Sequence, residues 1–287
     1  MKNALAILIF MFQLAISAKS QRLSVDLMPG LMNYGGNLQT RGITYIEAQF
    51  GFEVGLEYRL SDKFGLRGDY LTGKLEGSDK FATNSFDINR NLSSTTLINE
   101  VSLSLEYDIF KLRIDKIWTP YVFAGVGVFQ FNPYTTDTAG NLVYLQPLGT
   151  EGEGLPQYPD RKLYALTQVN IPLGFGIKYA ISSDITVGFE VGFRKLFTDY
   201  LDDVSTTYPD EATLLAARGP EAVELSFRGN ELNPALPFPS GQNRGNPTIK
   251  KDFYYTGLFR FNYTFSSYRN SSSYRYRKGV ACPKYLL

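Results

Sequence analysis

The side chains of this sequence that could do chemistry are carboxylates, bases, aromatics and one thiol, because it contains no histidine. Histidine is the commonest general base and transition-metal ligand near neutral pH, so its absence excludes hydrolase and acyltransferase designs that rely on it. Asp199, Asp202 and Asp203 offer oxygen ligands of the kind that Ca²⁺ prefers. Their spacing matches no calcium-binding loop, and we interpret them as a solvated acidic rim. We therefore predict no catalytic residue, no metal site and no cofactor.

The only cysteine of the chain, Cys282, lies in a C-terminal tail, residues 266–287, that is rich in tyrosine and basic residues. An unpaired cysteine in an exported protein indicates either an intermolecular disulfide or a free thiol. We favour a tether to another protein. The hypothesis assigns partner binding to six tail residues: Tyr274, Arg275, Tyr276, Arg277, Lys278 and Cys282.

The N-terminus has the pattern of a secretory signal peptide. Lys2 precedes an apolar stretch over residues 4–16, and small residues follow at Ser17, Ala18 and Ser20. A membrane anchor helix is the alternative, but it needs about 20 apolar residues. We predict a signal peptide over residues 1–20, cut near Ala18 or Ser20.

The elements that must position these side chains are segments in which apolar and polar residues alternate. Short and long connections between these segments follow one another in regular order. The short connections cover residues 61–63, 108–119 and 182–184; the long ones run about 33–42, 77–97, 132–166 and 202–251. A transmembrane β-barrel has this rhythm, because every second connection is a tight periplasmic turn and the others are long extracellular loops. Both chain ends are then expected in the periplasm.

Five segments alternate apolar and polar residues over the length of a strand: 48–60, 101–107, 169–179, 185–194 and 253–265. One parity of such a strand faces lipid and the other faces the lumen. Three weaker candidates, 23–32, 64–75 and 120–131, bring the count to eight, and the last of them is apolar on both faces. The predicted fold is all-β: an eight-stranded antiparallel transmembrane β-barrel over residues 21–265, with long extracellular loops and a periplasmic C-terminal tail.

The polar parities of these strands carry charges of both signs. An eight-stranded barrel is just wide enough for side chains to fill it, and an unpaired buried charge costs several kcal/mol. We therefore expect these charges to pair with one another and to plug the lumen. The predicted inward charges are Glu53, Glu57, Arg59, Arg67, Asp69, Glu100, Glu106, Lys178, Glu190, Arg194 and Arg260.

The overall composition is nearly neutral and rich in aromatic residues. A net charge of +1 gives no indication of nucleic acid as a partner. The 20 tyrosines and 21 phenylalanines suit aromatic girdles at the two membrane interfaces. Trp118, beside the second short connection, fits either the periplasmic girdle or ordinary packing.

Several runs of the sequence resemble one family of Bacteroidetes outer-membrane barrels. They are residues 121–133, 145–152 (Leu-Gln-Pro-Leu-Gly-Thr-Glu-Gly), 197–205 (Phe-Thr-Asp-Tyr-Leu-Asp-Asp-Val-Ser), 244–247 (Arg-Gly-Asn-Pro) and the terminal Cys282-Pro283. The chain is similar over essentially its whole mature length to the PorG-like component of the type IX secretion system. The run 197–205 and the terminal Cys-Pro are the more specific parts of the likeness.

The resemblance implies a non-enzymatic part of a protein secretion and gliding machine in the outer membrane. Its implied partners are the lipid bilayer and a periplasmic ring made of a lipoprotein and its partner subunit. An intermolecular disulfide at Cys282 would link the barrel to that ring. Two alternatives remain open. One is a small-solute pore, and the other is a surface adhesin or receptor that acts through the proline-rich loops.

Overall fold

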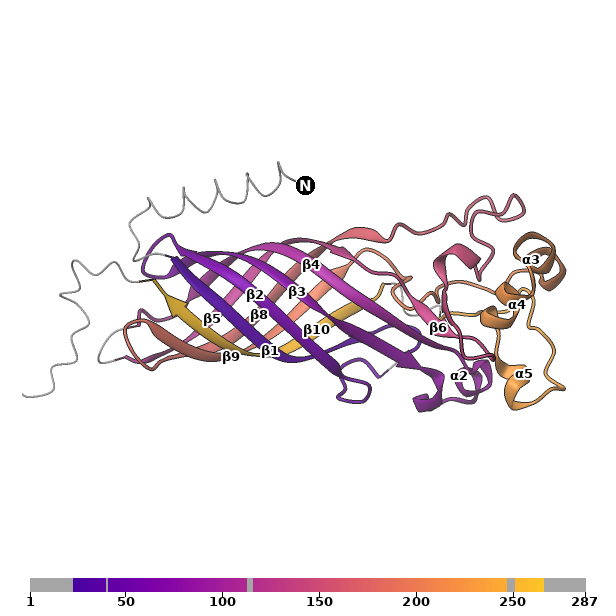
Figure 1. The fold of residues 1–287 in the computed structure, drawn as a ribbon, viewed down its shortest axis with the longest axis horizontal. Coiled ribbons are helices and arrows are strands. Elements are labelled where there is room, and N and C mark those ends of the chain that lie inside the picture. Colours follow the sequence, from indigo (N-terminus) through magenta and orange to yellow (C-terminus); the bar gives the residue numbers. More distant parts are fainter. Residues whose placement is uncertain (1–22, 40, 113–115, 247–250, 266–287) are drawn as a thin grey trace, which may run out of the picture.

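The computed structural model describes residues 23–39, 41–112, 116–246 and 251–265, and within them eight long antiparallel strands form a closed barrel (Figure 1). Each strand pairs with its neighbours along the chain, and the first pairs with the last, so the predicted eight-stranded antiparallel barrel is confirmed. The strands are β1 (Leu23–Gly35), β2 (Gln49–Arg59), β3 (Phe64–Ser78), β4 (Ser93–Asp108), β5 (Trp118–Gln130), β8 (Thr167–Ala180), β9 (Ile185–Leu196) and β10 (Phe253–Thr264).

Side-chain alternation along the strands divides the barrel into an apolar outside and a filled inside. On β2, Phe50 and Leu56 are exposed on the outer face, whereas Glu53 and Glu57 are buried. Successive strand residues point to opposite faces, so the period-two pattern of the sequence becomes this division directly. The outer face is the apolar belt that a lipid-embedded barrel requires.

The connections lie as their lengths predict. Residues 60–63, 109–117 and 181–184 join strands at one end, here called the short-turn end, where β1 begins and β10 finishes. Residues 36–48, 79–92, 131–166 and 197–252 join strands at the opposite, long-loop end. In Figure 1 the short-turn end lies at the left and the long-loop end at the right.

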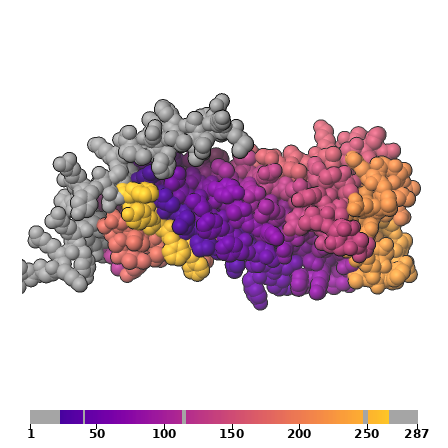
Figure 2. Space-filling model, in the orientation of Figure 1, coloured from indigo at the N-terminus to yellow at the C-terminus, as the bar shows by residue number. Residues whose placement is uncertain are grey.

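The long connections fold into a compact mass, here called the loop cap, made of the described residues of 79–92, 131–166 and 197–246. It contains the hairpin β6 (Tyr134–Thr136) and β7 (Leu142–Tyr144), two 3₁₀ turns, η2 (Asp79–Phe81) and η3 (Gln146–Leu148), and four helices: α2 (Ser85–Arg90), α3 (Glu211–Arg218), α4 (Pro220–Ser226) and α5 (Gly229–Leu232). On the face that Figure 2 shows, the loop cap continues the barrel without a break in the surface.

Helix α3 shows how local sequence sets the ends of these elements. The Asp210 side chain caps its first turn by accepting a hydrogen bond from the Thr213 amide, and Gly219 ends it at φ +87°. Pro220 then begins α4, because a proline needs no amide partner in the first turn of a helix.

The barrel interior has an apolar layer that the sequence pattern did not predict. It lies toward the long-loop end, where the inward-facing residues of the strands change from charged to apolar. Its buried members are Met32, Tyr34, Leu71, Leu75, Ile98, Phe129, Phe131, Tyr164, Leu196, Leu201 and Tyr254. Tyr164 and Leu201 belong to the loop cap, so this layer joins the cap to the barrel through one continuous core.

Candidate functional site: the filled lumen and the short-turn mouth

The charged layer of the lumen is organised around Arg67 on β3. Its guanidinium lies 2.6 Å from a carboxylate oxygen of Glu190, 3.0 Å from one of Glu53 and 3.3 Å from one of Glu106. All four side chains are almost completely buried, and they come from four different strands. A guanidinium has five donors in a fixed plane, so it can pair with several carboxylates at once.

Two further arginines extend this network along the barrel axis. Arg260 binds both oxygens of Asp26 at 2.7 Å and also reaches Glu106 at 2.6 Å. Arg194 donates to Glu53 at 2.9 Å and to the Thr256 hydroxyl at 2.8 Å. Every charge named in the sequence prediction lies on the inner face, so the expected pairing is confirmed. Asp26 was not among the predicted charges, although its parity with Ser24 on β1 was a usable signal.

Aromatic rings fill the space beside the arginines. Phe123 on β5 lies beneath the Arg67 guanidinium, 5.0 Å from its central carbon, and the Tyr121 hydroxyl donates to Glu190 at 2.7 Å. The residues opposite these rings on β8 are Gly174 and Gly176. A Cβ on either glycine would come within 2.6 Å of the facing ring, so both glycines are needed for the rings to turn inward. The described interior is therefore filled by side chains.

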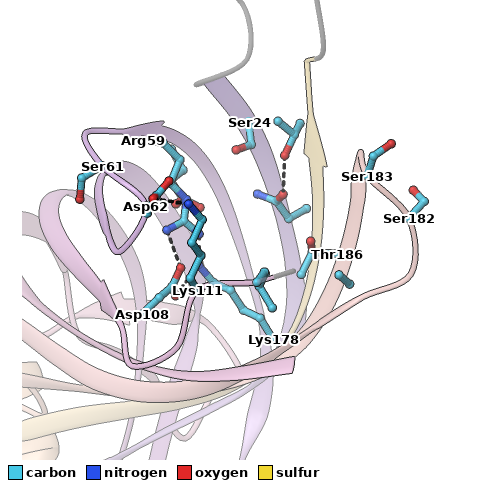
Figure 3. A pocket seen from close by; sticks show the side chains of 15 residues that line it. Ser24, Arg59, Ser61, Asp62, Asp108, Lys111, Lys178, Ser182, Ser183 and Thr186 are labelled. Atoms are coloured by element: carbon cyan, nitrogen blue, oxygen red, sulfur yellow. Dashed lines mark hydrogen bonds and ion pairs between the residues drawn. The ribbon is translucent and has the colours of Figure 1, made fainter. Parts of the chain in front are cut away.

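At the short-turn end the lumen opens into a polar recess of about 380 Å³ (Figure 3). Arg59 binds Glu57 at 2.7 Å and Asp108 at 2.5 Å in its wall, and Lys178 lies 3.4 Å from Asp108. The remaining lining residues are mostly hydroxyls and rim charges: Ser24, Ser61, Asp62, Lys111, Leu112, Ala180, Ser182, Ser183, Thr186, Asn262 and Thr264. This mouth is the accessible part of the charged network.

The loop cap holds a second buried network, around Arg244. This side chain donates to the Ser226 carbonyl at 3.1 Å and to Glu151 at 3.3 Å, and it also binds the Asp203 carbonyl. Burial raises the pKa of Asp203 to about 6, and the Arg244 charge partly offsets that rise. Glu151, Asp203 and Arg244, one residue from each of three runs of the sequence resemblance, thus meet here in the core of the cap.

The interpretation of Asp199, Asp202 and Asp203 as a solvated acidic rim is wrong. All three are largely or wholly buried, because they accept hydrogen bonds inside the cap. Asp202 accepts from the Leu38 amide at 2.9 Å and the Tyr34 hydroxyl at 3.2 Å, which ties the cap to β1. Among the described residues, no group of three or more potential ligands is arranged to hold a metal ion.

The predicted partner-binding residues and the predicted signal peptide lie outside the described residues. The partner-binding residues are Tyr274, Arg275, Tyr276, Arg277, Lys278 and Cys282.

Trp118 is exposed at the short-turn end, and its ring meets Phe110 edge to face at 5.7 Å. Both interpretations of Trp118 therefore have support. In the part of the chain that the structure covers, no helix is long and apolar enough to cross a membrane.

A closed barrel with an apolar belt outside and paired charges inside defines a membrane-spanning β-barrel. The model of the outer membrane protein beta-barrel domain family matches residues 4–213, and the chain belongs to this family. Its place is accordingly the outer membrane. A search of the curated proteins finds no match.

Solved structures that resemble the chain are also outer-membrane barrels. They include the Neisserial surface protein A (11% identity, TM-score 0.43, 85% of this chain and 97% of that one), OprG from Pseudomonas aeruginosa (9%, 0.40, 86% and 98%) and the attachment invasion locus protein Ail of Yersinia pestis in complex with sucrose octasulfate (8%, 0.39, 84% and 97%). Scores of this size assign no function to the chain.

Proposed function

We propose that this protein is a non-enzymatic anchor of a protein secretion machine in the outer membrane. The observation that carries the proposal is the filled lumen, in which three arginines hold the carboxylates of facing strands together. A barrel built in this way resists opening, so its function lies at its two ends. In this proposal the short-turn end faces the periplasm, and its polar mouth, with the tail that follows Phe265, meets a periplasmic partner.

The likeness of the sequence to the PorG-like family supports a type IX secretion system, with a link to gliding in an organism that glides. The partner is then a periplasmic ring that contains a lipoprotein. The proposal gives Cys282 a covalent contact with a ring subunit and gives the segment 274–278 a non-covalent one. The long-loop end faces the medium.

A non-reducing gel of purified outer membranes tests the tether, with Cys282→Ser as the matched control. The expected result is a high-mass species that contains the protein and a periplasmic subunit, collapses on reduction and is absent from the control. A monomer in both lanes would overturn the covalent tether. If a pull-down recovers no periplasmic partner with the wild-type protein or with Cys282→Ser, the anchor itself would be overturned.

Planar-bilayer conductance separates the anchor from a small-solute pore. The expected result is no stepwise conductance above that of the bare bilayer, because the charged layer and the apolar layer both close the lumen. Regular ion-conducting steps from the purified wild-type protein would favour the pore.

One feature of the loop cap favours the alternative of a surface receptor. A groove of about 690 Å³ lies at its tip, between the turn at Thr138 and helices α4 and α5. Its lining includes the aromatic rings of Phe227 and Phe238 and the carboxylates of Glu211 and Glu224. Deletion of residues 229–238 that abolishes ligand capture and spares secretion would support this second function.

A further inference from the structure

The two most exposed large apolar side chains of the described residues lie on one short loop and not on the barrel wall. Ile43 is 69% exposed and Tyr45 is 88% exposed, whereas the most exposed belt residue, Val126, reaches 66%. Side chains of this kind, exposed together on an ordered loop, mark an interaction surface. The loop that carries them, residues 41–48, connects β1 to β2.

This loop folds back over the outer wall of the barrel. Asn33 and Tyr255 are paired neighbours on β1 and β10, at the parity that faces outward. The Asn33 amide group donates to the carbonyls of Thr44 at 3.0 Å and Ile46 at 2.8 Å, and Asn33 is buried as a result. The next outward residue on β1, Leu31, is 54% exposed on the belt. The loop therefore lies directly above lipid-facing wall.

Tyr255 fixes the height of the loop. Its hydroxyl accepts a hydrogen bond from the Thr44 amide and donates to the Thr44 carbonyl, both at 2.8 Å. Along β10 the outward tyrosines Tyr255 and Tyr263 are eight residues apart, which at a tilt of about 40° is a height of about 20 Å. The apolar band of an outer-membrane barrel is about 25 Å tall. The two tyrosines thus stand near the two edges of that band, Tyr255 at the long-loop end and Tyr263 at the short-turn end.

Aromatic neighbours place the same row in the girdle at the long-loop end. The Tyr255 ring lies 6.2 Å from Phe193 and 6.1 Å from Phe253, both on the outer face of the barrel. Tyrosine is enriched at this level of a bilayer, where its ring contacts the acyl chains and its hydroxyl contacts the headgroups. Ile43 and Tyr45, both exposed, flank Thr44, whose backbone is bound to this row by Tyr255.

We propose that residues 41–48 form an interfacial anchor, which inserts Ile43 and Tyr45 into the leaflet at the long-loop end. The occupant of this apolar surface is the lipid bilayer, because the surface is continuous with the belt that lipid already covers. The loop clamps the barrel at a fixed depth. A partner protein at the same place would have to displace lipid from Leu31 and Phe253.

Fluorescence quenching in lipid vesicles tests the anchor with the full chain. Cys282→Ser removes the native thiol, and Tyr45→Cys or Ile43→Cys then takes an environment-sensitive NBD label. The matched control is Thr138→Cys, an exposed position at the tip of the loop cap. We expect phosphatidylcholine with a nitroxide near the headgroup to quench the labels at 43 and 45 severalfold more than the control, and iodide to do the reverse. Equal quenching by iodide at all three positions would overturn the proposal.

A second measurement avoids the apolar label. The double variant Ile43→Ser and Tyr45→Ser keeps the hydrogen bonds of Asn33 and Tyr255, since these bonds go to backbone atoms. We expect trypsin to cleave after Arg41 severalfold faster in this variant than in the wild type when both are in vesicles. An unchanged cleavage rate would show that lipid does not hold the loop, and it would also overturn the proposal.

Discussion

Replacement of Arg67 by leucine tests whether the ion pairs of the lumen hold the barrel together. Arg67 pairs with Glu53, Glu106 and Glu190 at 2.6 to 3.3 Å, and its side chain is 1% exposed. Removing one partner of a buried ion pair costs about 3–5 kcal/mol, because the remaining charge is left uncompensated. Glu190 suffers most, since its one other hydrogen bond comes from the Tyr121 hydroxyl. We therefore expect the free energy of unfolding to fall by about 3–5 kcal/mol.

Equilibrium unfolding in urea, with the protein in lipid vesicles, measures this change. Arg59→Leu is the matched control, because Arg59 binds Glu57 and Asp108 at the mouth, where its side chain is 24% exposed and water can replace it. The control should lose less than Arg67→Leu, because Glu57 keeps Arg260 at 2.8 Å and Asp108 keeps Lys178 at 3.4 Å. A loss below about 1 kcal/mol for Arg67→Leu would refute the reasoning.

A double variant separates the uncompensated charge from the lost packing. Glu190→Gln keeps an acceptor for the Tyr121 hydroxyl but removes the charge that Arg67→Leu leaves unpaired. The double variant should recover about 1–3 kcal/mol relative to Arg67→Leu alone. If it recovers nothing, the destabilisation comes from the shape of the leucine and not from electrostatics.

Three further outcomes are expected. Gly174→Val should destabilise the barrel by about 1–3 kcal/mol in the same urea assay, because its Cβ would lie 2.3 Å from a backbone carbonyl oxygen, whereas Gly68→Ala, with no neighbour within 4 Å, should be tolerated. Arg244→Met should expose the loop cap to limited proteolysis while the barrel stays folded, since all the Arg244 partners lie in the cap; equal protection would contradict this. The cap should also resist proteolysis better at pH 5 than at pH 8. Burial raises the pKa of Asp202 to about 7 and the pKa of Glu153 to about 8, above their ordinary values. The folded cap therefore holds these protons more tightly than the unfolded chain, and the stability that this gives at low pH is lost as pH rises through 7 to 8. Protection from proteolysis that rises with pH would contradict this prediction.

The fold and the outward face of the barrel follow from the sequence because they depend on local sterics. Successive strand residues point to opposite faces, so Val169 and Phe175 on one parity and Lys178 on the other assign themselves to lipid and lumen. The alternation of short and long connections orders the strands without any knowledge of contacts. The same reasoning found the inward charges, since an unpaired charge is costly in lipid.

The partners of those charges were decided only by closure of the barrel. Arg67 and Glu190 are 123 residues apart in sequence and 2.6 Å apart in the structure. Strand 120–131 is apolar on both parities, so its sequence alone does not determine which face turns inward. Gly174 and Gly176 on the facing strand decide it, because they leave room for the rings of Phe123 and Tyr121.

The loops depended still more on tertiary structure. A carboxylate such as Asp202 is solvated by default, and it became buried only because Tyr34 on β1 and the Leu38 amide bind it there. In the same way, the sequence of residues 41–48 does not show where this connection lies on the barrel. Asn33 and Tyr255, which are far apart in the chain, hold that loop against the outer wall, and the proposed lipid contact of Ile43 and Tyr45 depends on those bonds. Local chemistry determined the strands, and long-range contacts determined what the loops do.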